Sequence, residues 1–210
     1  MEENSMDSII FDVDGTLWDS TENVAKAWSD CIQQDLGLSM EITAERLHQL
    51  FGKVLPEIAA RIFPEYDKET QLSYINKCCD KEHEYLLKYG NPTFDKVEET
   101  LKILSEKYKL FIVSNCQSGY IEVFLKVTGL SEYFTDYLCS GDTGNQKGAN
   151  IQEIIKRNQL SSAVYVGDTL GDHQACQEAG VPFVYASYGF GEVPDFAYTI
   201  EQFSDLSKIF

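Results

Sequence analysis

The chain of 210 residues is 43% hydrophobic and 24% charged, a composition typical of a soluble globular protein with one or two domains. At this length a chain buries enough surface to form a core without a disulfide or a metal ion. Seventeen Lys and Arg residues against 34 Asp and Glu residues give a net charge of −17, which argues against nucleic acid or an anionic membrane surface as a partner.

The first predicted element is a strand over residues 8–13, a short apolar run rich in β-branched residues that Gly15 ends. Four similar runs follow later in the chain. Each is bounded by Gly, Pro, Asn or Asp, and each is apolar on both faces, as expected for a parallel sheet covered by helices on both sides. These runs predict strands over 110–113, 137–139, 163–166 and 183–186.

A helical stretch separates the first two predicted strands. Apolar residues at helical spacing predict helices around 24–32, 47–51, 55–62 and 72–79, and no strand-like run interrupts them. The tetrapeptide at 89–92, Tyr-Gly-Asn-Pro, reads as the return linker to the sheet. We therefore expect a helical domain of residues 19–89, inserted in a core of residues 1–18 and 90–210.

Beyond the insert, strands alternate with helical patterns. Val97, Leu101 and Leu104 share one helical face, and the last of these helices ends near Gly180. Such alternation predicts an α/β fold in which a doubly wound, Rossmann-like parallel sheet has right-handed crossovers. Sheets of this kind bind ligands beyond the carboxyl ends of their strands.

Polar residues gather at four of these predicted strand ends. The first strand runs into Asp-Val-Asp-Gly-Thr and the second into Ser-Asn. A lysine loop follows the third strand, and Gly-Asp-Thr-Leu-Gly-Asp follows the fourth. Because the carboxyl ends of parallel strands meet at one edge of the sheet, we expect these side chains to converge on one pocket: Asp12, Asp14, Ser114, Asn115, Lys147, Asp168 and Asp172.

In this order, the motifs resemble the haloacid dehalogenase superfamily, and within it the phosphatases of the phosphoglycolate phosphatase-like branch. The insert resembles the α-helical cap that this superfamily carries between its first two motifs. The resemblance spans nearly the whole chain and implies hydrolysis of a small phosphorylated metabolite. It implies that Asp12 attacks phosphorus and becomes an aspartyl phosphate, while Asp14 protonates the leaving alkoxide and then activates water.

Several acids around a phosphate require a cation, and Mg²⁺ is the ion that favours oxygen ligands and retained waters. By the resemblance, its ligands are the Asp12 carboxylate, the Asp14 backbone carbonyl and Asp168. Asp172 would hold a metal-bound water or Lys147. Phosphate binding and stabilisation of transition-state charge would come from Ser114, Asn115 and Lys147.

Two of the motifs are not simple matches to the family pattern. The family usually places proline after its lysine, whereas Gly148 follows Lys147 here. Gly-Asp-Thr also occurs twice. We prefer the copy that contains Asp168, because it follows the cleaner strand and has Asp172 four residues on. The other copy is expected to make Asp142 a loop acid.

Within the insert, Gly52 and Lys53 lie in a predicted loop between two helices, where the resembling family commonly reads its substrate. Lys53 is therefore a candidate for contacting a substrate anion, and an exposed lysine at a helix end is an equally good interpretation. The histidines have no spacing that suggests catalysis, so His48, His83 and His173 are expected on the surface or in packing.

Other functions on related scaffolds remain open. A sugar-phosphate mutase usually carries a histidine in the first cap helix, near Val24 and Ala25 in this chain. A phosphonate hydrolase uses a cap lysine as a Schiff base, for which Lys53 is available. A dehalogenase needs no metal and usually lacks the second acid, so Asp14 and Asp168 argue against it. A receiver-like phosphorylation module lacks a helical insert, and a non-catalytic binding protein has no need of the paired acids.

The location of the protein is predicted from features that are absent. No apolar run approaches the ~20 residues of a membrane-spanning helix, and residues 1–7 are acidic and polar, unlike a secretory signal. The six cysteines show no metal-ligand spacing, which is typical of reduced thiols. We expect a cytoplasmic protein without a membrane partner, and the sequence carries no signal for an oligomeric state.

Overall fold

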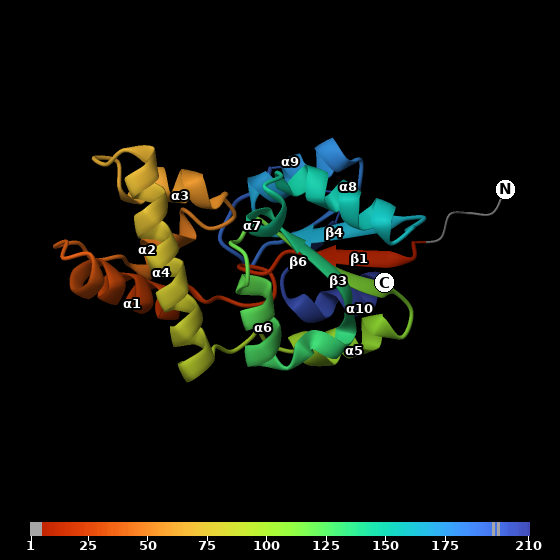
Figure 1. Ribbon diagram of the computed structural model, residues 1–210. Coiled ribbons are helices and arrows are strands. Elements are labelled where there is room, and N and C mark those ends of the chain that lie inside the picture. Colours follow the sequence, from red (N-terminus) through yellow and green to blue (C-terminus); the bar gives the residue numbers. More distant parts are fainter. Residues whose placement is uncertain (1–5, 195, 197) are drawn as a thin grey trace.

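A computed structural model describes residues 6–194, 196 and 198–210 as an α/β core with a group of helices beside it (Figure 1). The core sheet has six parallel strands in the order β3–β2–β1–β4–β5–β6. The chain therefore winds outward from β1 in both directions, which confirms the predicted Rossmann-like class. The strands are β1 (Ser8–Phe11), β2 (Lys109–Ser114), β3 (Phe134–Cys139), β4 (Ala163–Gly167), β5 (Phe183–Ala186) and β6 (Tyr198–Ile200).

Helices cover both faces of the sheet (Figure 1). Alternate residues of β1 enter two separate cores: Ile9 and Phe11 belong to one, and Ile10 to the other. Burial on both faces is the reason that the three residues after Ser8 in this strand are all apolar. The first core packs against α5 (Val97–Ser105), α6 (Tyr120–Thr128) and α10 (Leu206–Ile209), and the second against α8 (Lys147–Arg157) and α9 (Leu170–Ala179).

The remaining large helices stand beyond the carboxyl ends of the strands (Figure 1). They are α1 (Thr21–Asp30), which continues as a π-helix (Cys31–Asp35), α2 (Ala44–His48), α3 (Leu55–Ile62) and α4 (Lys68–Tyr89). The longest, α4, starts where the Asp67 carboxylate accepts the Thr70 N–H at 2.9 Å, and it ends at Gly90, whose φ is +74°. Within the described residues, none of the helices is both long enough and apolar enough to cross a membrane.

Several elements were missing from the sequence prediction. Strand β6 lies at the sheet edge and buries only Ile200, so it offered no apolar run. Helix α6 was not predicted, although it buries one side against the sheet. Asp142, expected in a loop, lies in the short helix α7 (Ser140–Thr143). Two 3₁₀ turns, Leu130–Tyr133 and Phe203–Asp205, complete the described elements.

Lys147 also lies elsewhere than predicted, because it is the first residue of α8 and not part of a loop. The adjacent Gly148 faces α9. A Cβ atom at Gly148 would lie 2.6 Å from Glu178 Oε2 and 3.2 Å from the Ala175 carbonyl oxygen. Glycine in place of the usual proline therefore allows α8 to approach α9 closely at the residue that follows the lysine.

Replacing Gly148 with proline would crowd α9 and disfavour helical geometry at Lys147. We expect this variant to lose about 2 kcal/mol of stability, which lowers Tm by roughly 4–8 °C in a chain of this length. Thermal unfolding followed by circular dichroism measures the change. Gly148→Ala, which adds one carbon but favours the helix, should lose less. A proline variant as stable as the parent would contradict close packing at this position.

Candidate active site

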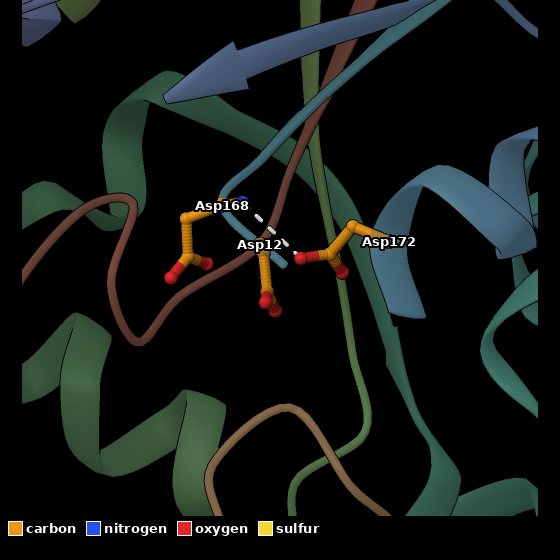
Figure 2. Close-up of side chains that lie close together, drawn as sticks. All are labelled: Asp12, Asp168 and Asp172. Carbon is orange, nitrogen blue, oxygen red and sulfur yellow. Dashed lines mark hydrogen bonds between the residues drawn. The ribbon is translucent and has the colours of Figure 1, made fainter. Parts of the chain in front are cut away.

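The carboxyl edge of the sheet collects the acids that the sequence singled out. Asp12 directly follows β1, Asp168 directly follows β4, and Asp172 lies in the first turn of α9. Figure 2 shows their carboxyl groups side by side, and one oxygen of each lies within 4.8 Å of the others. All three residues are buried, with at most 2% of their surface exposed. The predicted convergence of strand ends therefore produces a buried acid cluster.

One buried ammonium group stands among these acids. Lys147 Nζ lies 2.9 Å from Asp12 Oδ2 and 2.5 Å from Asp172 Oδ1, and the residue is 2% exposed. Burial alone would lower the pKa of Lys147, but the two carboxylate charges raise it above its usual value. Lys147 therefore stays charged. Its ammonium connects the carboxyl end of β1 to the first turn of α9 through a pair of ionic hydrogen bonds.

The second oxygen of Asp172 is used by the loop after β4. Asp172 Oδ2 accepts the N–H of Asp168 at 3.2 Å, the N–H of Thr169 at 2.9 Å and the Thr169 hydroxyl at 2.7 Å. In return, the Asp172 N–H donates to Thr169 Oγ1, which forms a capping box at the start of α9. Asp172 is thus fixed in place and holds Lys147, one of the two roles expected from the resemblance.

Asp12 and Asp168 keep oxygens that this network leaves largely free. Among the described residues, the buried Asp12 Oδ1 has no hydrogen-bond partner, and Asp168 Oδ1 has only a long contact, 3.4 Å, with the Thr16 hydroxyl. Burial raises the pKa of both carboxyls, and the charge of Asp172 adds to this effect. Three clustered carboxyls face a single ammonium, and carboxylate oxygens are the ligands that Mg²⁺ takes. The residues present therefore fit the ion that the sequence implied.

Gly15 brings the first motif against this cluster. Its φ is +79°, and a Cβ atom there would lie about 2.1 Å from Asp168 Oδ2. No side chain fits in that space, and L-residues seldom adopt that backbone conformation. The glycine of the first motif is therefore required by the close approach of the loops after β1 and β4.

Asp14 has a different environment from Asp12. Its Oδ1 accepts hydrogen bonds from Trp18 Nε1 at 3.0 Å, the Ser20 hydroxyl at 2.8 Å and the Tyr120 hydroxyl at 2.8 Å. Burial raises the pKa of Asp14 to about 7, even though these donors lower it and only the charge of Asp12 adds to the rise. A carboxyl near neutrality can both give and take a proton at physiological pH.

Among the cavities between the sheet edge and the inserted helices, two border the residues of the site: one has Asp12 and Asp14 in its wall, and the other has Lys147. The smaller, of about 30 Å³, has room for about two water molecules. Its core residues include Asp12, Asp14 and Ser114, and its insert residues are Trp28, Phe51, Gly52, Lys53, Leu55, Ile58 and Glu82. The larger, of about 650 Å³, borders Lys147 and Thr169. The loop of residues 51–53 lines both of these cavities. The inserted helices therefore lie closed over the sheet edge.

The predicted substrate-reading loop is attached to the core by Asn115. Its Nδ2 donates to the Gly52 carbonyl at 2.8 Å, and its Oδ1 accepts the Ser140 hydroxyl at 2.8 Å. Gly52 itself has a φ of +85°, and the partly buried Lys53 follows it. Asn115 thus contacts the insert, and its predicted part in phosphate binding stays a prediction. The role of Ser114, which is 5% exposed at the small cavity, is equally open to test.

Glu82 is a site residue that the sequence reasoning missed. It lies on α4, is 2% exposed and lines the small cavity. Trp28 Nε1 donates to its Oε2 at 2.6 Å, and Gln117 Nε2 donates to its Oε1 at 3.0 Å. A signal was present, because Glu82 continues a buried helical stripe through Ile75 and Cys79 where an apolar residue is expected.

Together, the doubly wound sheet, the buried acid cluster with its lysine and the helical cover define a Rossmann-like enzyme with a site suited to a divalent cation. Comparison with known proteins identifies its family. The sequence profile of the haloacid dehalogenase-like hydrolases matches residues 9–186. The chain belongs to this family, and it is a hydrolase that resembles the phosphoglycolate phosphatases.

Similar proteins span almost the whole chain. A phosphoglycolate phosphatase of Aquifex aeolicus is 29% identical over 96% of this chain and 95% of its own length. The pyrophosphatase PpaX of Listeria welshimeri is 28% identical over 82% of this chain and 79% of its own. Among solved structures, a haloacid dehalogenase-like hydrolase of Streptococcus pneumoniae superposes with a TM-score of 0.84 at 21% identity, covering 99% of both chains. This last likeness concerns the fold.

The buried carboxyl of Glu82 should be visible in the pH dependence of stability. Burial raises its pKa from 4.5 to about 8 in the folded protein. Between these two values the unfolded chain gives up the proton and the folded one keeps it, so the contribution of Glu82 to stability falls as pH rises. Glu82→Gln should therefore gain Tm over the parent between pH 5 and pH 8.5, by roughly a few degrees at the upper end. Parallel Tm profiles would contradict the raised pKa, and the exposed Glu84→Gln is the matched control.

Proposed function

We propose that the protein is a Mg²⁺-dependent phosphatase that hydrolyses small phosphomonoesters through an aspartyl phosphate on Asp12. An Asp12 carboxylate oxygen forms a bond to phosphorus while the bond to the leaving oxygen breaks, and Asp14 gives its proton to that oxygen. Water, losing a proton to Asp14, then attacks phosphorus, which releases inorganic phosphate and restores both carboxyls.

The observation that carries this proposal is the contrast between the two carboxyls of the first motif. Asp12 is held by the Lys147 ammonium through one oxygen, and its other oxygen has no partner. Asp14, at the same small cavity, has a pKa of about 7. The Lys147 ammonium favours the ionised form that a nucleophile needs, against the burial that raises the pKa of Asp12, and the environment of Asp14 suits an acid that exchanges protons.

The acid cluster needs positive charge when a phosphate binds. Asp12, Asp168 and the backbone carbonyl of Asp14 would hold Mg²⁺, which supplies Lewis-acid stabilisation of the transferring phosphoryl group. Lys147 contributes the fixed positive charge of the protein itself, and Ser114 adds a hydroxyl donor at the small cavity. Asp172 positions Lys147 by its short hydrogen bond.

The helical insert would act as a cap over this chemistry. We assign residues 19–89 to it, and residues 1–18 and 90–210 to the catalytic core. Its closed position over the small cavity excludes bulk water from the aspartyl phosphate, and opening would admit substrate. The contact between Asn115 and the Gly52 carbonyl ties closure to a residue that follows β2.

The substrate is expected to be a small phosphorylated metabolite in the cytoplasm. Because two relatives are named as a phosphoglycolate phosphatase and a pyrophosphatase, a substrate screen should include phosphoglycolate and pyrophosphate. A mutase is less well supported, because Val24 and Ala25 are buried apolar residues where a catalytic histidine is expected. Phosphonate cleavage would need the Lys53 amine to form a Schiff base, and a receiver module would have no use for the insert.

Multiple turnover of p-nitrophenyl phosphate tests the proposal. We expect Mg²⁺ to support hydrolysis and EDTA to stop it, with recovery when Mg²⁺ is returned. Asp12→Asn should lower kcat by at least about four orders of magnitude, because an amide is a poor nucleophile. Asp142→Asn, the same change in the other Gly-Asp-Thr copy, is the control and should stay active. Metal-independent turnover, or an active Asp12→Asn variant, would contradict the mechanism.

A second variant separates the two proposed roles of Asp14, as general acid and as general base. Asp14→Asn should lower kcat/KM about 100- to 10,000-fold for alkyl phosphates, whose leaving oxygen needs a proton. With p-nitrophenyl phosphate, whose leaving group needs none, we expect a burst of nitrophenolate, because water attack on the aspartyl phosphate is slowed. Rapid-quench kinetics with both substrates measures this. Equal losses for both substrates without a burst would remove Asp14 from proton transfer.

A further inference from the structure

Glu82 places a negative or neutral carboxyl where a substrate's leaving group has to lie. The direction of the leaving group follows from Asp14, because a general acid must reach the leaving oxygen. Asp12 and Asp14 border the small cavity together with Glu82, whereas Lys147 borders only the larger one. A phosphoryl group on Asp12 with its leaving oxygen toward Asp14 therefore directs the rest of the substrate into the small cavity.

The carboxyl of Glu82 is held rigidly in that cavity. Trp28, from the inserted helices, fixes one oxygen at 2.6 Å, and Gln117, from the core, fixes the other at 3.0 Å. Each carboxylate oxygen can accept a further hydrogen bond. Both oxygens of Glu82 are therefore held in a fixed position, and each can still accept a hydrogen bond from a ligand.

No fixed cation neutralises this carboxyl in the part of the chain that the structure describes. The ion pairs there, at N–O distances up to 4.0 Å, do not include Glu82. Much of the surrounding cavity wall is apolar and comes from Trp28, Phe51, Leu55 and Ile58. In such surroundings a hydrogen-bond donor on the ligand is strongly favoured. A second carboxylate would meet the cost of desolvation, and it would also meet repulsion once Glu82 ionises, above its pKa of about 8.

We propose that Glu82 selects substrates whose leaving group carries a hydrogen-bond donor, a hydroxyl or an ammonium group, and rejects those whose leaving group carries a carboxylate. This inference rests on the proposed phosphatase function and names its substrate class. Phosphoglycolate, which has a carboxylate in this position, would then be a poor substrate.

Lys53 supports the opposite preference. It also lines the small cavity, and its ammonium would attract a carboxylate. Lys53 is more exposed than Glu82, however, and it also borders the larger cavity, whereas Glu82 is confined to the small one. We therefore assign Lys53 to general attraction of the phosphate and Glu82 to discrimination between leaving groups.

Four two-carbon phosphomonoesters test the inference, because they differ only at the far end of the leaving group. They are ethyl, 2-hydroxyethyl, 2-aminoethyl and carboxymethyl phosphate, the last being phosphoglycolate. For the unmodified protein with Mg²⁺ at pH 9, where Glu82 with its pKa of about 8 is ionised, we expect kcat/KM for the hydroxyethyl or aminoethyl ester to exceed that for phosphoglycolate by at least about tenfold. The ratio of the hydroxyethyl to the aminoethyl ester shows which donor is preferred.

Glu82→Gln keeps the shape of the side chain and removes the charge that Glu82 carries above its pKa of about 8. Relative to ethyl phosphate, we expect it to raise kcat/KM for phosphoglycolate and to lower that for aminoethyl phosphate, each by about tenfold. A purely structural role for Glu82 would change all four esters in parallel and leave their order as it was. Glu84→Gln, on the exposed side of the same helix, should leave the order and the rates unchanged.

Each outcome separates the inference from the function on which it rests. No turnover of p-nitrophenyl phosphate would refute the phosphatase itself. Turnover of p-nitrophenyl phosphate with phosphoglycolate preferred among the four esters would refute only the selection by Glu82. In that case Lys53→Met should abolish the preference for phosphoglycolate, whereas under the inference it lowers all four esters together. The panel on the unmodified protein decides the matter even if a variant fails to fold.

Discussion

The ion-paired ammonium of Lys147 is the interaction on which the rest of the site depends. It lies between Asp12 and Asp172 at hydrogen-bond distance from both, and all three side chains are buried. Removal of one partner from such a group leaves a buried charge without compensation, which typically costs about 3–5 kcal/mol. The position of Asp12 is therefore fixed by the stability of the core, and the orientation of its second oxygen, Oδ1, is set as well.

The same arrangement explains how two acids from one short segment have different surroundings. Asp12 faces the ammonium, whereas Asp14 turns toward neutral donors, two of which, Ser20 and Tyr120, are hydroxyls. The turn at Gly15 makes this possible, since a side chain there would occupy the space of Asp168. Identical carboxyl groups are thus distinguished by what surrounds them, in the way that acid and nucleophile are distinguished in other hydrolytic enzymes.

The sequence predicted the part of the site that the sheet alone determines. Parallel strands end at one edge, so Asp12, Ser114 and Asp168 had to meet once the strands were recognised. Lys147 was expected nearby, but its place at the start of α8 depends on how closely two helices pack, which periodicity does not report. The contact of Asn115 with the insert was not expected, because docking between two units of the chain has no local signal, and its part in phosphate binding stays a prediction.

Glu82 illustrates the same limit and shows what the missed residue contributes. The helical stripe on α4 indicated only a buried position, and its meaning depended on Trp28 and Gln117, which come from two other parts of the fold. The Glu82 carboxyl has no ion-pair partner among the described residues, so it lowers the stability of the folded protein at neutral pH and above. A packing role alone does not explain this loss.

At the site, that carboxyl gives the two ends of a substrate opposite electrostatic surroundings. Lys147 and the acid cluster that fits a cation lie on the side of the phosphoryl group, and Glu82 lies on the side of the leaving group. The charge of Lys147 attracts the dianionic phosphate of a substrate, and the carboxyl oxygens of Glu82 accept from a donor at the other end of the substrate, so both groups favour the same orientation. Discrimination of this kind requires a group that is unfavourable for the wrong ligand as well as one that is favourable for the right one.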